Sequence, residues 1–190
     1  MSGCQVLSVD SINPNIMKKI LLFTLSIFIL TSCTEIIFEE AQPVGVKAMN
    51  QFPNELQGKF GLVILNEESI VEIGKNSIKN EDGIAYLSDS LIVKKLGDRY
   101  VVNIKIAEGS EEKKGNWQTY VLEDRGCGFV KATSFIVSED YIEDFTSQYE
   151  NKTIGDQQNR SIIIKPTAAQ FNTILADDSV TVSMILERLD

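Results

Sequence analysis

The sequence predicts a mainly β fold: an antiparallel meander or barrel-like sheet with one or two short helices near the C-terminal end. Between Gly58 and Val137, short apolar runs alternate with polar turns, which is the pattern of strands joined by hairpins. The turn pairs Asp82-Gly83 and Gly97-Asp98 contain glycine, which adopts the positive φ values that tight hairpins need. The stretch Val180–Leu189 then alternates apolar and polar residues, as a strand with one buried face does.

The expected strands follow one another at short intervals, so we expect chain neighbours to pair as antiparallel neighbours in the sheet. The run 100–107 shows the alternation most clearly, because Val102, Ile104 and Ile106 fall on one face. The last two runs form a hairpin around Asp124-Arg125-Gly126. In chain order the expected strands are 59–65, 69–73, 77–79, 84–87, 91–96, 100–107, 117–122 and 129–137.

The C-terminal part contains helical patterns. Tyr141, Phe145 and Tyr149 are spaced four residues apart among acidic residues, which indicates a short amphipathic helix. The polar stretch 151–159 that follows is expected to be a loop.

A second short helix is expected at Ala168–Leu175. Thr167 and Gln170 have the spacing of a capping box, in which each side chain satisfies a backbone N–H at the helix start. Pro166 precedes them and ends a strand expected at 161–165, because proline has no N–H to donate.

The N-terminal part carries a different signal. Met17-Lys18-Lys19 is followed by the apolar run Ile20–Leu30 and then by Thr31-Ser32-Cys33. A bilayer-spanning helix needs roughly 20 apolar residues, so this run is too short to span. A positive start, a short apolar middle and small residues at the end are typical of a secretory signal peptide. The competing interpretation is a buried helix that ends at a chance cysteine.

The end of this run, Leu30-Thr31-Ser32-Cys33, resembles the lipobox of bacterial lipoprotein precursors. The resemblance implies that the Cys33 sulfur receives diacylglycerol, that cleavage follows Ser32, and that the new amino terminus takes a further fatty acyl chain such as palmitate. The partner of the protein is then the lipid bilayer, held through acyl chains on Cys33. Thr34 stands where an Asp would signal retention in the inner membrane, so the expected location is the cell envelope, at the outer membrane.

These signals divide the chain into three parts. Residues 1–32 are an upstream extension plus the signal peptide, with Met17 as the expected true start. Residues 33–57 are expected to be the lipidated N-terminus and a tether, because they show no sustained period. Residues 58–190 are expected to form a single antiparallel β domain, which is long enough to bury a core.

Composition excludes several classes of function. The formal net charge is -9, whereas nucleic-acid binding needs clustered cations, so no nucleic-acid partner is expected. The chain has no histidine, which excludes Ser-His-Asp catalysis and His-ligated zinc. Once Cys33 is lipidated and the extension with Cys4 is removed, Cys127 is the remaining thiol, too few for a zinc cluster. We therefore expect no cofactor, no metal and no enzymatic activity.

Three weaker candidates remain as alternatives. Cys127 lies in Gly126-Cys127-Gly128 beside Arg125, where a cation could activate the thiol, or where a small residue simply fits a bulged hairpin. Aspartates in the predicted turns could bind calcium, but aspartate is also a common turn residue. A pair of carboxylates could serve a hydrolase such as a glycosidase, although the sequence does not select a pair.

The domain also resembles a known fold family. Gly58-Lys59-Phe60 opens the first strand, and a strand meander, a helix and a last strand follow. This order resembles the lipocalins, whose first strand carries Gly-x-Trp; here Phe60 stands in place of the Trp. The resemblance implies a barrel whose alternate residues line a cavity for a small apolar ligand.

The sequence thus predicts a membrane-anchored, non-enzymatic lipoprotein of the bacterial envelope with a binding or structural role. A lipocalin-like carrier of a small hydrophobic ligand and a carboxylate-based hydrolase are the alternatives. An apolar cavity in a barrel would favour the carrier, two facing carboxylates the hydrolase, and a filled core a protein-interaction role.

Overall fold

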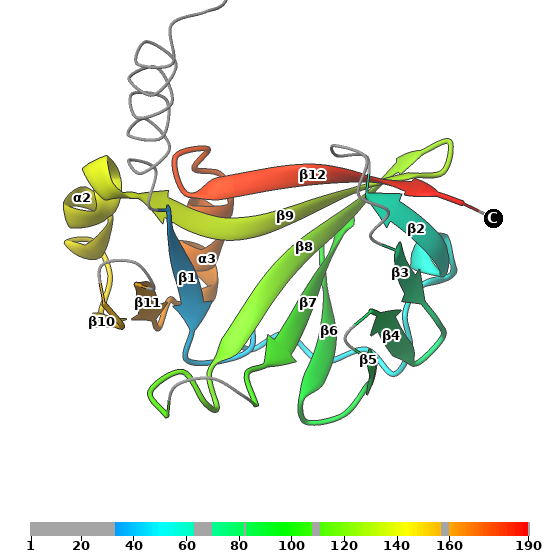
Figure 1. Cartoon of the computed structure of the whole chain (residues 1–190), viewed down its shortest axis with the longest axis horizontal. Coiled ribbons are helices and arrows are strands. Elements are labelled where there is room, and N and C mark those ends of the chain that lie inside the picture. Colours follow the sequence, from blue (N-terminus) through cyan, green and yellow to red (C-terminus); the bar gives the residue numbers. More distant parts are fainter. Residues whose placement is uncertain (1–32, 63–69, 82, 108–110, 157–159, 190) are drawn as a thin grey trace, which may run out of the picture. The chain divides into compact units, whose positions relative to one another are not determined.

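A computed structural model describes residues 33–189 except for 63–69, 82, 108–110 and 157–159. Within it, Cys33–Asp190 form one compact unit. The predicted signal segment Met17–Ser32, the end of the strand predicted at 59–65 and Asp82 of a predicted turn lie outside the described residues. The unit is mainly antiparallel β, a nearly closed, barrel-like sheet with two short α-helices, which confirms the predicted fold class (Figure 1).

The strands occur close to the predicted runs, with two additions discussed below. The helices are η1 (Asn54–Leu56), η2 (Glu139–Tyr141), α2 (Ile142–Thr146) and α3 (Ala168–Leu175). The strands are β1 (Cys33–Phe38), β2 (Gly58–Leu62), β3 (Ile70–Ile73), β4 (Ser77–Asn80), β5 (Gly83–Tyr86), β6 (Leu91–Leu96), β7 (Arg99–Lys105), β8 (Trp117–Gly126), β9 (Phe129–Ser138), β10 (Asn151–Ile154), β11 (Ser161–Ile164) and β12 (Thr181–Arg188).

The barrel is an up-and-down meander that the last strand closes. Strands β2 to β5 pair in sequence order, and so do β6 to β9. Strand β12 pairs with β9 on one side and with β2 on the other, so Leu186 lies opposite both Val130 and Leu62. In the described part of the chain no ladder joins β5 to β6, and this is where the barrel stays open.

Alternation along the strands sends side chains to two separate cores. On β7, Val102 joins the core inside the barrel, while its neighbour Val101 joins a second core on the outer face. On β8, Leu122 and Val121 divide in the same way. The inner core contains Phe52, Leu56, Phe60, Ile73, Leu91, Val93, Tyr100, Val102, Leu122, Val130, Ala132 and Leu186.

The second core lies between the outer face of the sheet and helix α3. Its centre is a group of three rings, Phe38, Phe135 and Phe171, whose centroids lie 5.2 to 5.6 Å apart. Phe38 comes from β1, Phe135 from β9 and Phe171 from α3. The three rings therefore join the N-terminal strand, the barrel and the C-terminal helix in one packed unit.

The segment expected to be a tether is part of the fold, which corrects the prediction for residues 33–57. Strand β1 pairs antiparallel with β9, and it runs parallel to β11, with Glu35 opposite Ser161. Ile36, Ile37 and Phe38 are at most 2% exposed. The run Ile36-Ile37-Phe38 is too short to show a period, and its partners lie about a hundred residues away, so local patterning does not reveal the strand.

A buried polar cluster holds the segment after β1 along the edge of β6. The Asn103 side chain accepts a hydrogen bond from the Gln42 N–H at 2.7 Å and donates one to the Gln42 carbonyl at 2.8 Å. The Lys94 ammonium donates to the carbonyls of Ala41 and Pro43 at 2.6 and 2.9 Å. Burial lowers the pKa of Lys94, and Glu40 nearby opposes that shift. The Met49 N–H then bonds to β6, so this segment covers an otherwise open strand edge.

The C-terminal predictions were confirmed in part. The capping box of Thr167 and Gln170 is formed at the start of α3. The amphipathic helix is shorter than its aromatic spacing indicates, because α2 spans one turn and a half after η2. The stretch predicted as a polar loop at 151–159 contains β10, which pairs with β11 and buries Ile154.

Candidate functional site

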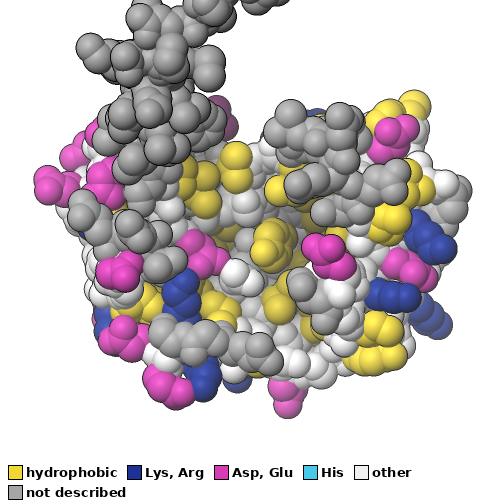
Figure 2. Space-filling view, viewed as in Figure 1, with side chains coloured by type: hydrophobic (Ala, Val, Ile, Leu, Met, Phe, Trp, Pro, Cys, Tyr) yellow, Lys and Arg dark blue, Asp and Glu magenta, His cyan; other side chains and the backbone are white. Residues whose placement is uncertain are grey.

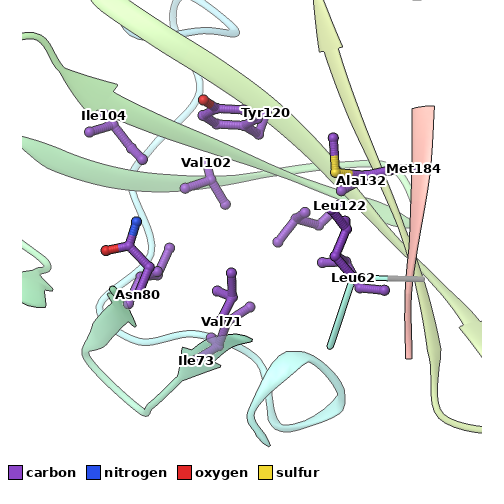
Figure 3. Close-up of a pocket in the computed structure, with 12 residues that line it drawn as sticks. Leu62, Val71, Ile73, Asn80, Val102, Ile104, Tyr120, Leu122, Ala132 and Met184 are labelled. Atoms are coloured by element: carbon purple, nitrogen blue, oxygen red, sulfur yellow. The ribbon is translucent and has the colours of Figure 1, made fainter. Parts of the chain in front are cut away.

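The inside of the barrel contains an apolar cavity of about 310 Å³ (Figure 3). Its walls come from β2, β3, β4, β7, β8, β9 and β12, so residues far apart in the sequence meet there. Most of the lining is aliphatic, with Leu62, Val71, Val102, Leu122 and Met184 among its residues. The described lining residues carry no charged side chain.

The cavity exists because the inward residues are too small to fill the barrel. Ala132 contributes only a methyl group at a position where β9 faces the interior. Val71 and Val102 are also short. A barrel of this size either packs its interior with larger side chains or leaves room for one small ligand, and here the space is left.

The polar groups of the cavity lie at one end. In Figure 3, Asn80 and the Tyr120 hydroxyl lie on the same side as Ile104, while Leu62, Leu122 and Met184 lie on the other. The Asn80 side chain accepts a hydrogen bond from the Gly83 N–H at 3.2 Å. The Tyr120 hydroxyl has no hydrogen-bond partner within the described residues. Burial raises the pKa of Tyr120, and the charge of Glu35 raises it further, so the phenol stays protonated as a donor.

Glu35 lies beyond this polar end in a network of its own. Its carboxylate accepts hydrogen bonds from Gln118 at 2.6 Å, from Lys113 at 3.3 Å and from Ser161 at 3.4 Å. Gln118 precedes Tyr120 by two residues on β8, so both side chains lie on the same face of the strand. The Glu35 carboxylate is therefore held on the same face of β8 as the Tyr120 side chain, which lines the cavity.

Helix η1 and the last strand meet beside the inner core. Phe52 and Leu56 are fully buried there with Phe60. The Arg188 guanidinium lies 4.9 Å from the centre of the Phe60 ring, donates to the Glu55 carbonyl at 2.9 Å, and also donates to the Gln57 carbonyl. Phe60 is thus fixed under a cation that also holds η1.

A second hydrogen bond secures η1 from the other side. The Tyr100 hydroxyl donates to the Glu55 carboxylate at 2.5 Å. This bond lowers the pKa of Glu55 and raises the pKa of Tyr100 to about 12. The contact depends on an ionised carboxylate and a protonated phenol, so both acid and alkali should weaken it.

We expect Tyr100→Phe to flatten the pH dependence of stability at both ends. Because folding lowers the pKa of Glu55, its carboxylate stabilises the fold at pH values above its pKa in the unfolded chain, and this stabilisation is lost as the pH falls through the lower pKa of the folded state. Folding raises the pKa of Tyr100, so the stabilisation from its hydroxyl is lost as the pH rises through about 12. Urea unfolding at a series of pH values should show a smaller decline in the free energy of unfolding, towards acid and towards alkali, in the variant than in the wild type. Tyr86→Phe, at a residue 64% exposed, is the control. Equal pH profiles for Tyr100→Phe and wild type would contradict this role.

The predicted lipidation site lies at the edge of the described unit. Cys33 is the first residue of β1, opposite Ser138 of β9, and it is exposed. The exposed sulfur could accept a modification without disturbing the core. Tyr120, Glu35 and Arg188 were not singled out from the sequence, although the alternation of 117–122 places Tyr120 on the same face as Leu122.

The weaker candidates are not brought together. Cys127 is exposed at the tip of the β8–β9 hairpin, where its φ is 53° between two glycines of positive φ. The Arg125 guanidinium bonds to Glu123 at 3.0 Å. Within the described residues no group of three or more acidic or cysteine side chains is placed to hold a metal ion. No carboxylate is found among the described cavity-lining residues, so the cavity offers a glycosidase no acid pair there.

A second hollow of about 580 Å³ lies beside α2 and is polar. Glu139, Asp140, Glu143 and Asp144 surround it, and Arg160 bonds to Glu139 at 2.8 Å. Figure 2 shows acidic side chains on the side of the unit where α2 lies. These carboxylates project from a solvated turn of helix, and the described lining is mostly polar, with Ile142 as its aliphatic contribution.

The chain was also compared with known proteins. It matches no family model, no curated protein and no solved structure. Among the described helices, none has the length and apolar character that crossing a membrane requires.

Proposed function

We propose that this protein is a lipid-anchored lipoprotein of the bacterial envelope whose barrel carries a small hydrophobic ligand. The observation that carries the proposal is the apolar cavity inside the barrel. Its volume of about 310 Å³ lies at the lower end of the range of roughly 300–1,000 Å³ typical of small-molecule sites. The lining combines an aliphatic wall with two polar groups at one end, which is also typical of such sites.

The topology gives independent support for a carrier of the lipocalin type. The resemblance rests on the order of elements after Gly58-Lys59-Phe60, a strand meander, a helix and a last strand. The pairing of the last strand, β12, with β2, on which Phe60 is buried, is compatible with it. The lipobox at Leu30-Thr31-Ser32-Cys33 supports the anchor. Strand β1 starts at the predicted acylated cysteine, so the carrier would lie close to the bilayer, from which hydrophobic molecules could enter.

Filling the cavity should abolish ligand binding. Ala132→Phe places a ring in the interior, whereas Ile185→Phe places the same ring on β12 at a side chain 41% exposed. We expect the unit Cys33–Asp190 to bind the apolar dye N-phenyl-1-naphthylamine saturably, with a fluorescence increase. Because the ring occupies the space of the ligand, Ala132→Phe should weaken binding by at least about tenfold, or about 1.4 kcal/mol, and Ile185→Phe should not.

Circular dichroism of both variants controls for folding, since an overpacked core can cost about 1–3 kcal/mol. Saturable binding that survives in a folded Ala132→Phe variant would show that the dye binds elsewhere. A wild-type unit that gives no saturable binding would contradict the carrier function.

A further inference from the structure

We propose that the cavity selects an uncharged apolar molecule with one hydrogen-bond acceptor, which the Tyr120 hydroxyl binds, and that it rejects the matching carboxylate. This inference rests on the proposed carrier function and specifies the class of ligand. It depends on three observations: the free donor at the polar end of the cavity, the absence of a cation among the described lining residues, and the position of Glu35.

The Tyr120 hydroxyl is the group that would orient the ligand. It lines the cavity, its side chain is partly buried, and no described residue accepts a hydrogen bond from it. The hydroxyl is therefore available to donate to a ligand carbonyl or hydroxyl oxygen in the cavity. Asn80 lies on the same side of the cavity, so the oxygen of the ligand belongs at this end and its hydrocarbon part against Leu122 and Met184 (Figure 3).

The charge of the surroundings excludes an anion. None of the described lining residues is a lysine or an arginine, so a buried carboxylate would have no counter-ion in the cavity. Burial raises the pKa of Tyr120, and the Glu35 carboxylate raises it further; the same carboxylate, held by Gln118 at 2.6 Å on the Tyr120 face of β8, would repel a ligand anion. The Lys113 ammonium that pairs with Glu35 at 3.3 Å is not among the described lining residues of the cavity.

The volume limits the size of the ligand. A cavity of about 310 Å³ has the volume of about ten water molecules at roughly 30 Å³ each, and because covalently bonded atoms lie closer together than separate waters, it has room for a ligand of roughly ten to twenty non-hydrogen atoms. A medium-chain ketone, alcohol or aldehyde fits this limit, whereas a full membrane lipid does not. We therefore infer a ligand with a chain of about ten carbons and a single neutral polar group.

The test is competition between 2-decanone and decanoate for the N-phenyl-1-naphthylamine site at neutral pH. The two ligands have the same chain length and differ in charge. We expect the wild-type unit to bind 2-decanone at least about tenfold more tightly than decanoate, because the anion loses its hydration without gaining a counter-ion. Tyr120→Phe should weaken the binding of 2-decanone about fivefold to tenfold by removing one hydrogen bond, with the ketone affinity of each protein compared with the dye affinity of that same protein.

Two further variants separate the causes. Tyr86→Phe removes a hydroxyl that is exposed on β5, and it should leave both affinities unchanged. Glu35→Gln keeps hydrogen-bonding capacity but removes the negative charge. It should therefore increase the affinity for decanoate relative to that for 2-decanone. The inference is overturned if decanoate binds as well as the ketone, or if Tyr120→Phe does not affect the ketone. A wild-type unit that does not bind the dye would instead overturn the carrier function and this inference with it.

Discussion

Replacing Phe171 with alanine should lower the free energy of unfolding by about 3–5 kcal/mol, the usual cost of removing a buried ring from a packed core. Phe171 is fully buried, and its centroid lies 5.6 Å from those of both Phe38 and Phe135. The truncation would leave a cavity between α3 and the barrel. Because small domains are stable by only about 5–15 kcal/mol, this loss is a large share of the total.

The matched control is Phe129→Ala. Phe129 is the first residue of β9 and is 37% exposed, so the same truncation removes much less buried surface. Urea unfolding of the unit Cys33–Asp190, followed by circular dichroism, measures both variants. Similar losses for Phe171→Ala and Phe129→Ala would mean that α3 does not depend on the ring cluster for its attachment.

Local patterning was enough to predict the mainly β, antiparallel fold class. Alternation over 100–107 correctly put Val102 and Ile104 on one face, because a strand with different surroundings on its two faces needs a period of two. Ile106, predicted on the same face, follows the end of β7 and packs against a separate small cluster. The capping box at Thr167 marked the start of α3 to the residue, because its two hydrogen bonds depend on neighbours in the chain. Features with short-range causes were therefore accessible from the sequence.

Features with long-range causes were not. Strand β1 is a short apolar run whose ladders join it to β9 and β11, and nothing near it in the chain requires a strand. The cavity depends on Ala132, Val71 and Tyr120 meeting across the barrel, and no single one of them is unusual in its own strand. The position of Glu35 near Tyr120 followed only when the expected tether proved to be part of the sheet.

The place of β1 also changes the expectation for the anchor. Cys33 is exposed, and Ile36 three residues later is already buried in the outer core. If Cys33 carries the acyl chains, almost no polypeptide lies between the lipid and the folded unit. The described unit would then be held close to the membrane, with its orientation restricted by the ladder that joins Cys33 to Ser138.

The anchor itself gives the second large prediction. Cys33→Ser in the full chain, expressed in a bacterium that processes lipoproteins and fed a labelled fatty acid, should abolish labelling and leave the precursor unprocessed, because a hydroxyl cannot replace the thiolate nucleophile. The wild type should be labelled and found with the membranes, since each buried methylene contributes about 0.8 kcal/mol and two or more chains give stable attachment.

Cys127→Ser is the matched control, because it removes the other exposed cysteine within the described residues and should leave labelling unchanged. Label retained by Cys33→Ser would assign the acyl chains to another residue. A wild type that is cleaved, unlabelled and absent from the membrane fraction would contradict the lipoprotein proposal. The cavity would remain in that case, since its described lining residues all come from strands β2 to β12, so the carrier function stands or falls on the binding experiments alone.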